Sequence, residues 1–175
     1  MDTRFAAAMQ RRTATVAVSA SAVRGIGPKG TAAAARVYLA NLNLDSISQP
    51  TERRFRTVLD RETRELKDHL PRGGRHWGLA RKLLNIFLRD ALYNQYLSKL
   101  YRLKSVEPWL EVPLDSHVGK ALHSEFLDSR LPAWKTIKAL TPELSATFQS
   151  AARVTARRRG VAAVHLDLYF WRGQG

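Results

Sequence analysis

The sequence contains no cysteine among its 175 residues. This absence excludes disulfide bonds, zinc sites with thiolate ligands and cysteine-ligated iron–sulfur clusters. The sequence also lacks an uninterrupted run of about 18 apolar residues, so it predicts no membrane-spanning helix. Residues 1–23 lack the apolar core of a secretory signal. We therefore expect a cytoplasmic protein that has no membrane partner.

Several common catalytic motifs are missing as well. The chain has no Walker phosphate-binding loop, no Gly-x-Ser-x-Gly, no His-Glu-x-x-His and no carboxylate cluster that suits a two-metal nuclease. No metal ion or other cofactor is therefore expected. No strand pattern is persuasive, whereas apolar residues such as Phe55, Val58, Leu59 and Leu66 recur at helical spacing. The sequence predicts an all-α protein.

Acidic residues are scarce compared with basic ones. The chain has 29 lysines and arginines against 15 aspartates and glutamates, which gives a formal net charge of +14. Residues 1–75 hold 14 basic and 7 acidic residues and residues 76–175 hold 15 and 8, so each part carries +7. Such a distributed excess favours a polyanionic partner, most often nucleic acid. A ribosome or an anionic membrane surface would satisfy the same charge.

A short turn around Asp115 is the most informative stretch. An apolar segment, Leu110–Leu114, leads directly to Asp115. Proline, here Pro113, suits the start of a helix, and aspartate is a favoured N-cap because its carboxylate accepts the free N–H groups of the first turn. The sequence therefore predicts that a helix starts near Asp115. On this reasoning alone, Asp115 need be no more than a helix cap.

Residues Pro113–Val118, with the sequence Pro-Leu-Asp-Ser-His-Val, resemble a motif of the helix-hairpin-helix DNA glycosylase superfamily. The resemblance extends from about Leu70 to the C-terminus. It implies that Asp115 is the catalytic carboxylate and that an upstream lysine, here Lys82, is the nucleophile of a glycosylase/lyase. The 33-residue separation is similar to the archaeal 8-oxoguanine glycosylase branch and unlike the endonuclease III branch. The implied fold has about seven to nine helices in two lobes around a cleft.

With 175 residues, the chain is expected to form one domain, or two small lobes that share a core. Residues 23–175 are expected to form a single helical domain, preceded by residues 1–22 as a loosely ordered or Ala-rich segment. Within this domain, residues 79–103 are apolar on almost all faces and predict a central buried helix. Its polar stripe, Lys82, Asn85 and Arg89, is expected to face a cleft or a partner. The alternative is a hydrated groove in which the stripe only pairs with Asp90 or Glu107.

Two glycine-containing loops are candidates for DNA contact. The first, Gly25–Gly30, resembles the hairpin of a helix-hairpin-helix motif, in which backbone N–H groups hold a phosphate. The second, Pro71–Gly78, combines glycines with arginines, a histidine and a tryptophan. The alternatives are an ordinary Gly/Pro loop for the first, and for the second a structural turn whose Trp77 packs in the core. The candidate contacts are Gly25, Gly27, Lys29, Arg72, Gly74, Arg75, His76, Gly78 and Arg81.

The remaining candidates surround the Asp115 turn. His117 and Lys120 are predicted DNA contacts, and His117 is also expected to help place the turn that carries Asp115. A base excised from DNA must first leave the stack, and aromatic side chains suit the pocket that receives it. Trp77, Trp109 and Trp171 are the candidate walls of this pocket. Residues 165–171 resemble the closing helix that packs beside the catalytic cleft in the glycosylase family.

The function that these expectations describe is that of a monomeric, nucleoid-associated DNA N-glycosylase. It would flip a damaged or modified base out of duplex or single-stranded DNA and excise it. Asp115 would stabilise the oxocarbenium-like state, and Lys82 would form a Schiff base if the enzyme is also a lyase. The alternative is a non-catalytic basic helical protein that binds DNA, or one associated with RNA or the ribosome.

Overall fold

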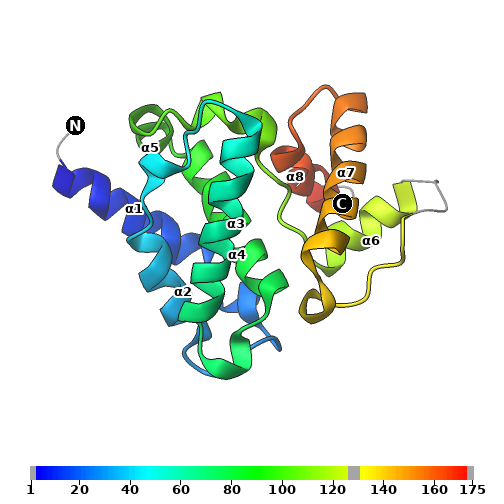
Figure 1. The fold of residues 1–175 in the computed structure, drawn as a ribbon, viewed down its shortest axis with the longest axis horizontal. Helices are drawn as coiled ribbons and strands as arrows, with labels where there is room; N and C mark the ends of the chain where they lie inside the picture. Colours follow the sequence, from blue (N-terminus) through cyan, green and yellow to red (C-terminus); the bar gives the residue numbers. More distant parts are fainter. Residues whose placement is uncertain (1–2, 126–130, 173–175) are drawn as a thin grey trace.

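The computed structural model describes residues 3–125 and 131–172, with side chains up to Phe170. Every regular element in these ranges is helical (Figure 1). Eight α-helices and seven short 3₁₀ helices are present there, and no strand. The prediction of an all-α fold is confirmed. None of the helices in the described part of the chain is long and apolar enough to cross a membrane.

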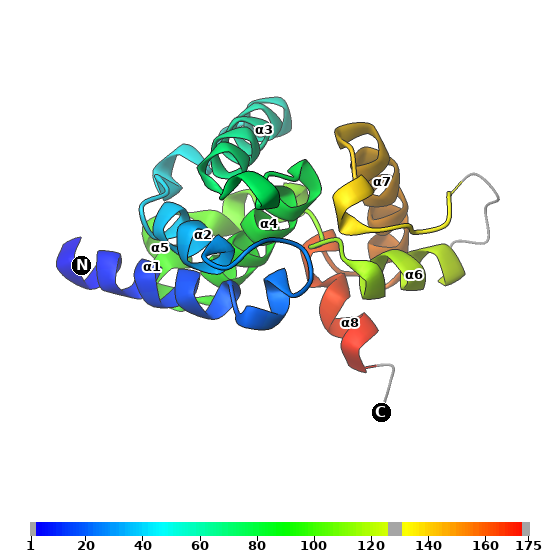
Figure 2. The ribbon, with the colours of Figure 1, turned by 90° about the horizontal axis from the view of Figure 1, so that it is seen from below.

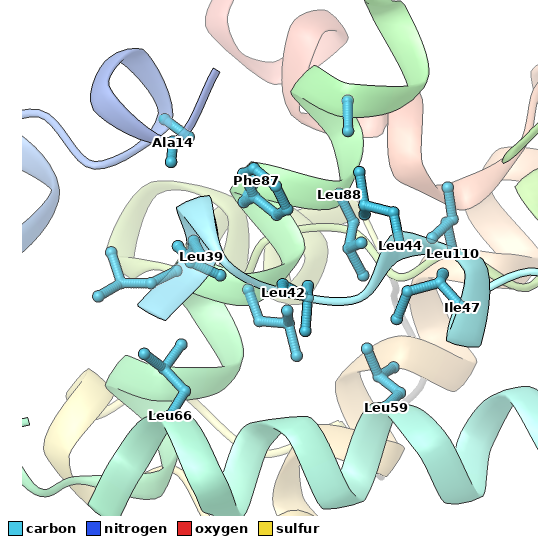
Figure 3. Close-up of a cluster of buried hydrophobic side chains, with 14 of the residues drawn as sticks. Ala14, Leu39, Leu42, Leu44, Ile47, Leu59, Leu66, Phe87, Leu88 and Leu110 are labelled. Atoms are coloured by element: carbon cyan, nitrogen blue, oxygen red, sulfur yellow. The ribbon is translucent and has the colours of Figure 1, made fainter. Parts of the chain in front are cut away.

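The N-terminal lobe comprises five α-helices that share one hydrophobic core (Figures 1 and 3). Its long helices α3 and α4 lie side by side, and α1 crosses α4 (Figure 2). The core includes Ala14, Leu39, Leu59, Leu66, Phe87 and Leu110. The elements are α1 (Thr3–Ala17), η1 (Ala20–Val23), α2 (Thr31–Ala40), η2 (Leu44–Ser46), α3 (Glu52–His69), η3 (Arg72–Gly74), α4 (Trp77–Tyr93), α5 (Gln95–Leu100), η4 (Leu103–Ser105) and η5 (Glu107–Trp109).

The C-terminal lobe is smaller and has its own hydrophobic core. Figure 2 shows α6, α7 and α8 grouped beside the N-terminal lobe. The core side chains include Val118, Leu122, Phe148, Leu166 and Phe170. The elements are α6 (Ser116–Glu125), η6 (Ile137–Ala139), α7 (Pro142–Arg158), η7 (Ala163–His165) and α8 (Leu166–Arg172). The two cores form the two lobes that the fold prediction anticipated.

The predicted central helix over residues 79–103 is interrupted. Helix α4 ends at Tyr93, and Asn94 then caps the separate helix α5 by accepting the backbone N–H groups of Tyr96 and Leu97, both at 3.1 Å. Asparagine competes with the helical backbone in this way, so it favours caps over helix interiors. Apolar periodicity alone did not reveal the break because α5 presents buried residues of its own, such as Leu97.

The N-terminal segment belongs to the first lobe. Residues 3–17 form α1, which contacts α2, α4 and α5. The buried side chain of Gln10 donates hydrogen bonds to the carbonyl oxygens of Leu39 (3.0 Å) and Leu42 (2.7 Å) at the end of α2. Residues 1–22 were expected to be either loosely ordered or an Ala-rich segment, and residues 3–17 form an Ala-rich helix. The segment after α1 then lies against α4.

An extended segment, residues 110–115, joins the lobes and is called the interlobe linker below. Leu110 packs in the first core and Val112 in the second. The side-chain amide of Gln149 on α7 bonds both backbone groups of Val112, accepting from its N–H (3.2 Å) and donating to its carbonyl oxygen (2.8 Å). The buried Glu111 accepts a hydrogen bond from Asn85 of α4 (3.0 Å). The linker is therefore held on both sides just before Asp115.

Candidate active site between the lobes

A cavity of about 430 Å³ lies between the two lobes and is called the Asp115 cavity below. Its walls come from four places in the sequence: the end of α1 with η1, the middle of α4, the interlobe linker with the start of α6, and α8. Its volume lies within the range of small-molecule sites. The lining residues are Val16, Ala17, Ser19, Ser21, Ala22, Lys82, Ile86, Arg89, Asp90, Pro113, Asp115, Val118 and Asp167.

Asp115 occupies the N-terminal end of α6, as the sequence predicted for a capping residue. Its Oδ1 atom accepts the backbone N–H groups of His117 and Val118, both at 2.9 Å. The positive end of the helix dipole favours a negative charge at this position. The carboxylate is half-buried and lines the cavity. Asp115 therefore combines a capping role with exposure to the cavity.

Lys82 faces the same cavity from α4. Its side chain is half-buried, and Nζ donates a hydrogen bond to the carbonyl oxygen of Ala22 in η1 (3.2 Å). Burial lowers the pKa of the Lys82 amine, and the negative charge of Asp115 offsets only part of this effect. A lowered pKa increases the share of neutral amine near neutral pH. An amine in this state is a better nucleophile than an exposed lysine.

A second group of charged residues lines the cavity where α4 meets α8: Arg89 and Asp90 of α4, and Asp167 of α8. Arg89 donates two hydrogen bonds to Asp90, from Nε (2.9 Å) and Nη2 (2.8 Å), and a third to Asp167. Burial raises the pKa of Asp167, although the positive charge of Arg89 opposes the rise. The Oδ1 atom of Asp167 is buried and has no hydrogen-bond partner among the described residues. Arg89 and Asp167 therefore tie α4 to α8 across one wall of the cavity.

The polar stripe of α4 divides between two environments. Lys82 and Arg89 line the cavity, as expected for residues that face a cleft. Asn85 is buried and points to Glu111 of the interlobe linker instead. Arg89 also takes the pairing with Asp90 that the alternative interpretation proposed. Both interpretations of the stripe therefore describe part of what the structure shows.

The two glycine-containing loops pack against each other at the lower end of the N-terminal lobe in Figure 1. A Cβ atom at Gly74 would lie 3.1 Å from Thr31 Oγ1, and one at Gly27 only 2.5 Å from the same atom. Both glycines thus allow the loops to approach the first turn of α2. Neither loop lines the Asp115 cavity. Close packing is therefore a sufficient structural reason for these two glycines.

Basic side chains project from this pair of loops. Lys29, Arg72 and Arg75 are exposed, and Arg75 Nε donates a hydrogen bond to the carbonyl oxygen of Leu70 (2.9 Å). Gly25 adopts a positive φ of 70°, which disfavours other residues, and His76 is half-buried. The loops therefore place three exposed cations on one end of the lobe, where the prediction of a DNA-backbone contact stays open.

Two predicted DNA contacts on α4 are not accessible. Arg81 is only 6% exposed and donates hydrogen bonds to Thr63 (2.8 Å) and Asp60 of α3. A Cβ atom at Gly78 would lie 2.3 Å from the carbonyl oxygen of Ile137, so this glycine lets η6 approach α4. The prediction that Arg81 and Gly78 contact DNA is wrong for this structure, because tertiary packing already engages both residues.

The predicted tryptophan pocket is absent from the described part of the cavity lining. Trp77 lies against the guanidinium of Arg81, with the Arg81 carbon 4.9 Å from the ring centroid. Trp109 packs on Phe55 with 6.2 Å between ring centroids. Both tryptophans contribute to hydrophobic packing, which was the alternative interpretation for Trp77. The side chain of Trp171 lies outside the described residues.

His117 and Lys120 lie on α6 just after Asp115. His117 Nε2 donates a hydrogen bond to the carbonyl oxygen of Phe170 (2.9 Å), which connects the first turn of α6 to α8. This bond supports the expectation that His117 helps to place the Asp115 turn. Lys120 is exposed on the following turn and remains available to a partner such as DNA.

Sequence reasoning missed two parts of the cavity wall. Asp167 was not selected as a site residue, although an acidic residue within the otherwise apolar closing helix was a signal. Ser19, Ser21 and Ala22 offered no recognisable motif, because backbone and hydroxyl groups of small residues carry little sequence signal. Within residues 3–125 and 131–172, no three acidic or histidine side chains are grouped as metal ligands would be.

Comparisons with known proteins assign neither a family nor a function to this chain. No protein-family model, no curated protein and no solved structure matches the chain.

Proposed function

We propose that this protein is a DNA N-glycosylase that uses Asp115 and Lys82 in the interlobe cavity. The observation that carries the proposal is that these two residues, 33 positions apart in the sequence, line one cavity. One is a carboxylate at a helix N-terminus and the other an amine whose pKa burial lowers. The basic charge of the chain supports a nucleic acid as the substrate.

The chemistry requires stabilisation of positive charge on a sugar. As the bond between C1′ and the base breaks, its electron pair leaves with the base and C1′ becomes cationic. Asp115 would stabilise this oxocarbenium-like state electrostatically. If neutral Lys82 then adds to C1′, the amine nitrogen forms a covalent bond to the sugar and loses its proton to solvent. Ring opening produces a Schiff base, which permits cleavage of the DNA strand.

The shape of the cavity constrains how a flipped base would be held. Its apolar lining includes Val16, Ile86 and Val118, and no aromatic ring contributes to the described lining. A flipped base would therefore lie against aliphatic side chains, with burial of apolar surface offsetting the few kcal/mol of unstacking. The exposed cations at Lys29, Arg72, Arg75 and Lys120 would contact phosphates.

The bonds of Asp115 favour one other function. Its Oδ1 atom already accepts two backbone N–H groups, which is what a purely structural N-cap does. On this basis the protein would bind nucleic acid, whether DNA or RNA, without cleaving it. Such binding would weaken steeply with salt and would not depend on a lesion.

The decisive experiment incubates the protein with duplex and single-stranded DNAs that carry damaged or modified bases, with and without borohydride. Excision and a borohydride-trapped adduct are expected for the wild type. Lys82→Ala should lose the adduct, whereas Lys99→Ala, an exposed lysine on α5, should retain it. Asp115→Asn should retain DNA binding and lower the excision rate by about a hundredfold or more, because it removes transition-state charge stabilisation.

Three other outcomes separate the hypotheses. Excision without a trapped adduct would leave Asp115 as the catalyst of a monofunctional glycosylase. Excision that is unchanged in Asp115→Asn would refute the assignment of the site. Tight, salt-sensitive binding without excision on any substrate would favour the non-catalytic function.

A further inference from the structure

A second hollow, of about 780 Å³, lies on the C-terminal lobe where it meets η5. It is lined by the last turns of α7, by the loop that leads to η7, and by Lys104 and Glu107 of the N-terminal lobe. It shares no lining residue with the Asp115 cavity. We call it the Arg153 hollow, after the side chain that distinguishes it.

Arg153 is a half-buried cation without a counter-ion. Among the residues that the structure describes, it forms no hydrogen bond or ion pair. Burial and then the positive charge of Arg56 lower the pKa of Arg153, and the negative charges of Glu52 and Glu111 only partly compensate. A guanidinium that has lost water without gaining a partner is energetically unfavourable.

Arg157 adds a second guanidinium to the hollow. It follows Arg153 by four residues on α7, so both side chains project from the same face of the helix. Its positive charge also contributes to the lowered pKa of Arg153. Two like charges placed side by side in this way become favourable when an anion lies between them.

The carboxylate of this hollow is already engaged. Glu107 accepts hydrogen bonds from Lys104 (3.1 Å) and from His165 Nε2 (2.7 Å). Burial raises the pKa of Glu107, but these two partners outweigh it and hold the pKa below its usual range. Glu107 is therefore paired with Lys104 and His165 and not with Arg153, and the three cations of the lining exceed its single carboxylate.

We propose that the Arg153 hollow binds a phosphate group, with Arg153 and Arg157 as its principal ligands. The planar guanidinium donates two parallel hydrogen bonds that match phosphate oxygens. The phosphate can be a free anion or a phosphodiester of a nucleic acid, since the recognised chemistry is the same. The proposal does not depend on catalysis at Asp115, because the two sites share no lining residue.

The test titrates the full chain at constant ionic strength with inorganic phosphate and, separately, with a short single-stranded oligothymidylate. Arg153→Gln and Arg157→Gln should each weaken binding by about tenfold or more, which is about 1.4 kcal/mol or more, because each variant loses a charge-assisted hydrogen bond to the phosphate. The matched control is Arg158→Gln, which removes the same charge from an exposed neighbour outside the lining. Its affinity should stay within about twofold of the wild type.

The two probes distinguish the sources of the phosphate. If Arg153→Gln and Arg157→Gln, but not Arg158→Gln, weaken the binding of both probes or of the oligonucleotide alone, the hollow binds a phosphodiester backbone. If these two variants weaken the binding of inorganic phosphate alone, the hollow binds a small phosphate compound. If Arg153→Gln and Arg158→Gln weaken the affinity equally, the binding is only general electrostatic attraction and the proposal is overturned. The proposal is also overturned if neither probe binds saturably.

Thermal unfolding provides a second measurement. Phosphate should raise the Tm of the wild type and of Arg158→Gln but not that of Arg153→Gln. Without phosphate, Arg153→Gln should unfold at the same temperature as the wild type or a higher one, because an unpaired, half-buried charge is removed. A lower Tm without phosphate would show that Arg153 is a structural residue and would overturn the proposal. Arg157→Gln, an exposed position, provides the affinity test even if Arg153→Gln does not fold.

Discussion

Helix α4 and the interlobe linker meet at two pairs of opposite charges that differ in kind. Arg81 and Glu111 form a closed pair, in which Nε lies 3.3 Å from Oε2 and both side chains are less than 9% exposed. Lys82 and Asp115 form an open pair, in which both groups line a cavity and each binds a backbone group. The closed pair is structural, whereas the open pair leaves both groups available to a ligand.

The difference arises from helix geometry. Adjacent residues on an α-helix point about 100° apart, so Arg81 and Lys82 cannot share an environment. Arg81 points toward α3, where its two terminal nitrogens donate hydrogen bonds to Thr63 and Asp60. Lys82 points toward η1, where it meets only the carbonyl oxygen of Ala22 among the described groups. Two cations that look equivalent in the sequence therefore have different roles.

The largest expected effect comes from breaking the closed pair. Arg81→Met leaves Glu111 buried without its cation and should lower the free energy of unfolding by about 3–5 kcal/mol. Lys82→Met should change it by less than about 1 kcal/mol, because Lys82 has a single backbone partner. Urea unfolding measures both. The double variant Arg81→Met/Glu111→Leu should regain much of the loss, and equal effects of the two single variants would contradict the distinction.

A smaller effect is expected at the carboxylate of the open pair. Asp115→Ala removes the cap of α6 and should lower the free energy of unfolding by about 1 kcal/mol. Asp115→Asn should cost only a few tenths of a kcal/mol, because asparagine is an equally good N-cap. Calorimetric unfolding of the two variants separates capping from charge. Comparable losses in both would mean that the carboxylate charge itself stabilises the fold.

The smallest expected effect is a pH dependence that comes from Lys82. Because its pKa in the folded protein lies below the ordinary value of 10.5, the unfolded chain binds more protons between these two values. The free energy of unfolding contributed by Lys82 should therefore rise with pH in that window. When unfolding is measured at increasing pH below 10.5, the free energy of unfolding of the wild type should rise relative to that of Lys82→Met. A constant difference would show that Lys82 is fully hydrated in the folded protein.

Local signals predicted helix starts well. The predicted helix start near Asp115 is confirmed, because its carboxylate accepts the backbone N–H groups expected of a cap. Thr51 and Thr141 cap α3 and α7 in the same local way. Caps are readable because they depend on the few residues that follow them. The break at Asn94 was missed since an apolar pattern on both sides concealed it.

The candidate site was predictable only where a residue carried a recognisable local context. Asp115 was selected because of the turn that contains it, and Lys82 because it belongs to a polar stripe on an otherwise apolar helix. Trp109 and Gly78 were misassigned because their partners, Phe55 and Ile137, are distant in the sequence. Asp167 was missed for the same reason, since its meaning depends on Arg89 across the cavity.

The sequence by itself determined the helical class of this protein, its main caps, its excess of positive charge and its lack of thiol chemistry. These properties depend on composition and on residues within one or two helical turns of each other. Only the tertiary structure decided which cations are paired, which glycines serve packing, and that Lys82 and Asp115 share a cavity. Those outcomes depend on contacts between segments distant in the sequence, which are fixed only when the two cores pack on either side of the interlobe linker.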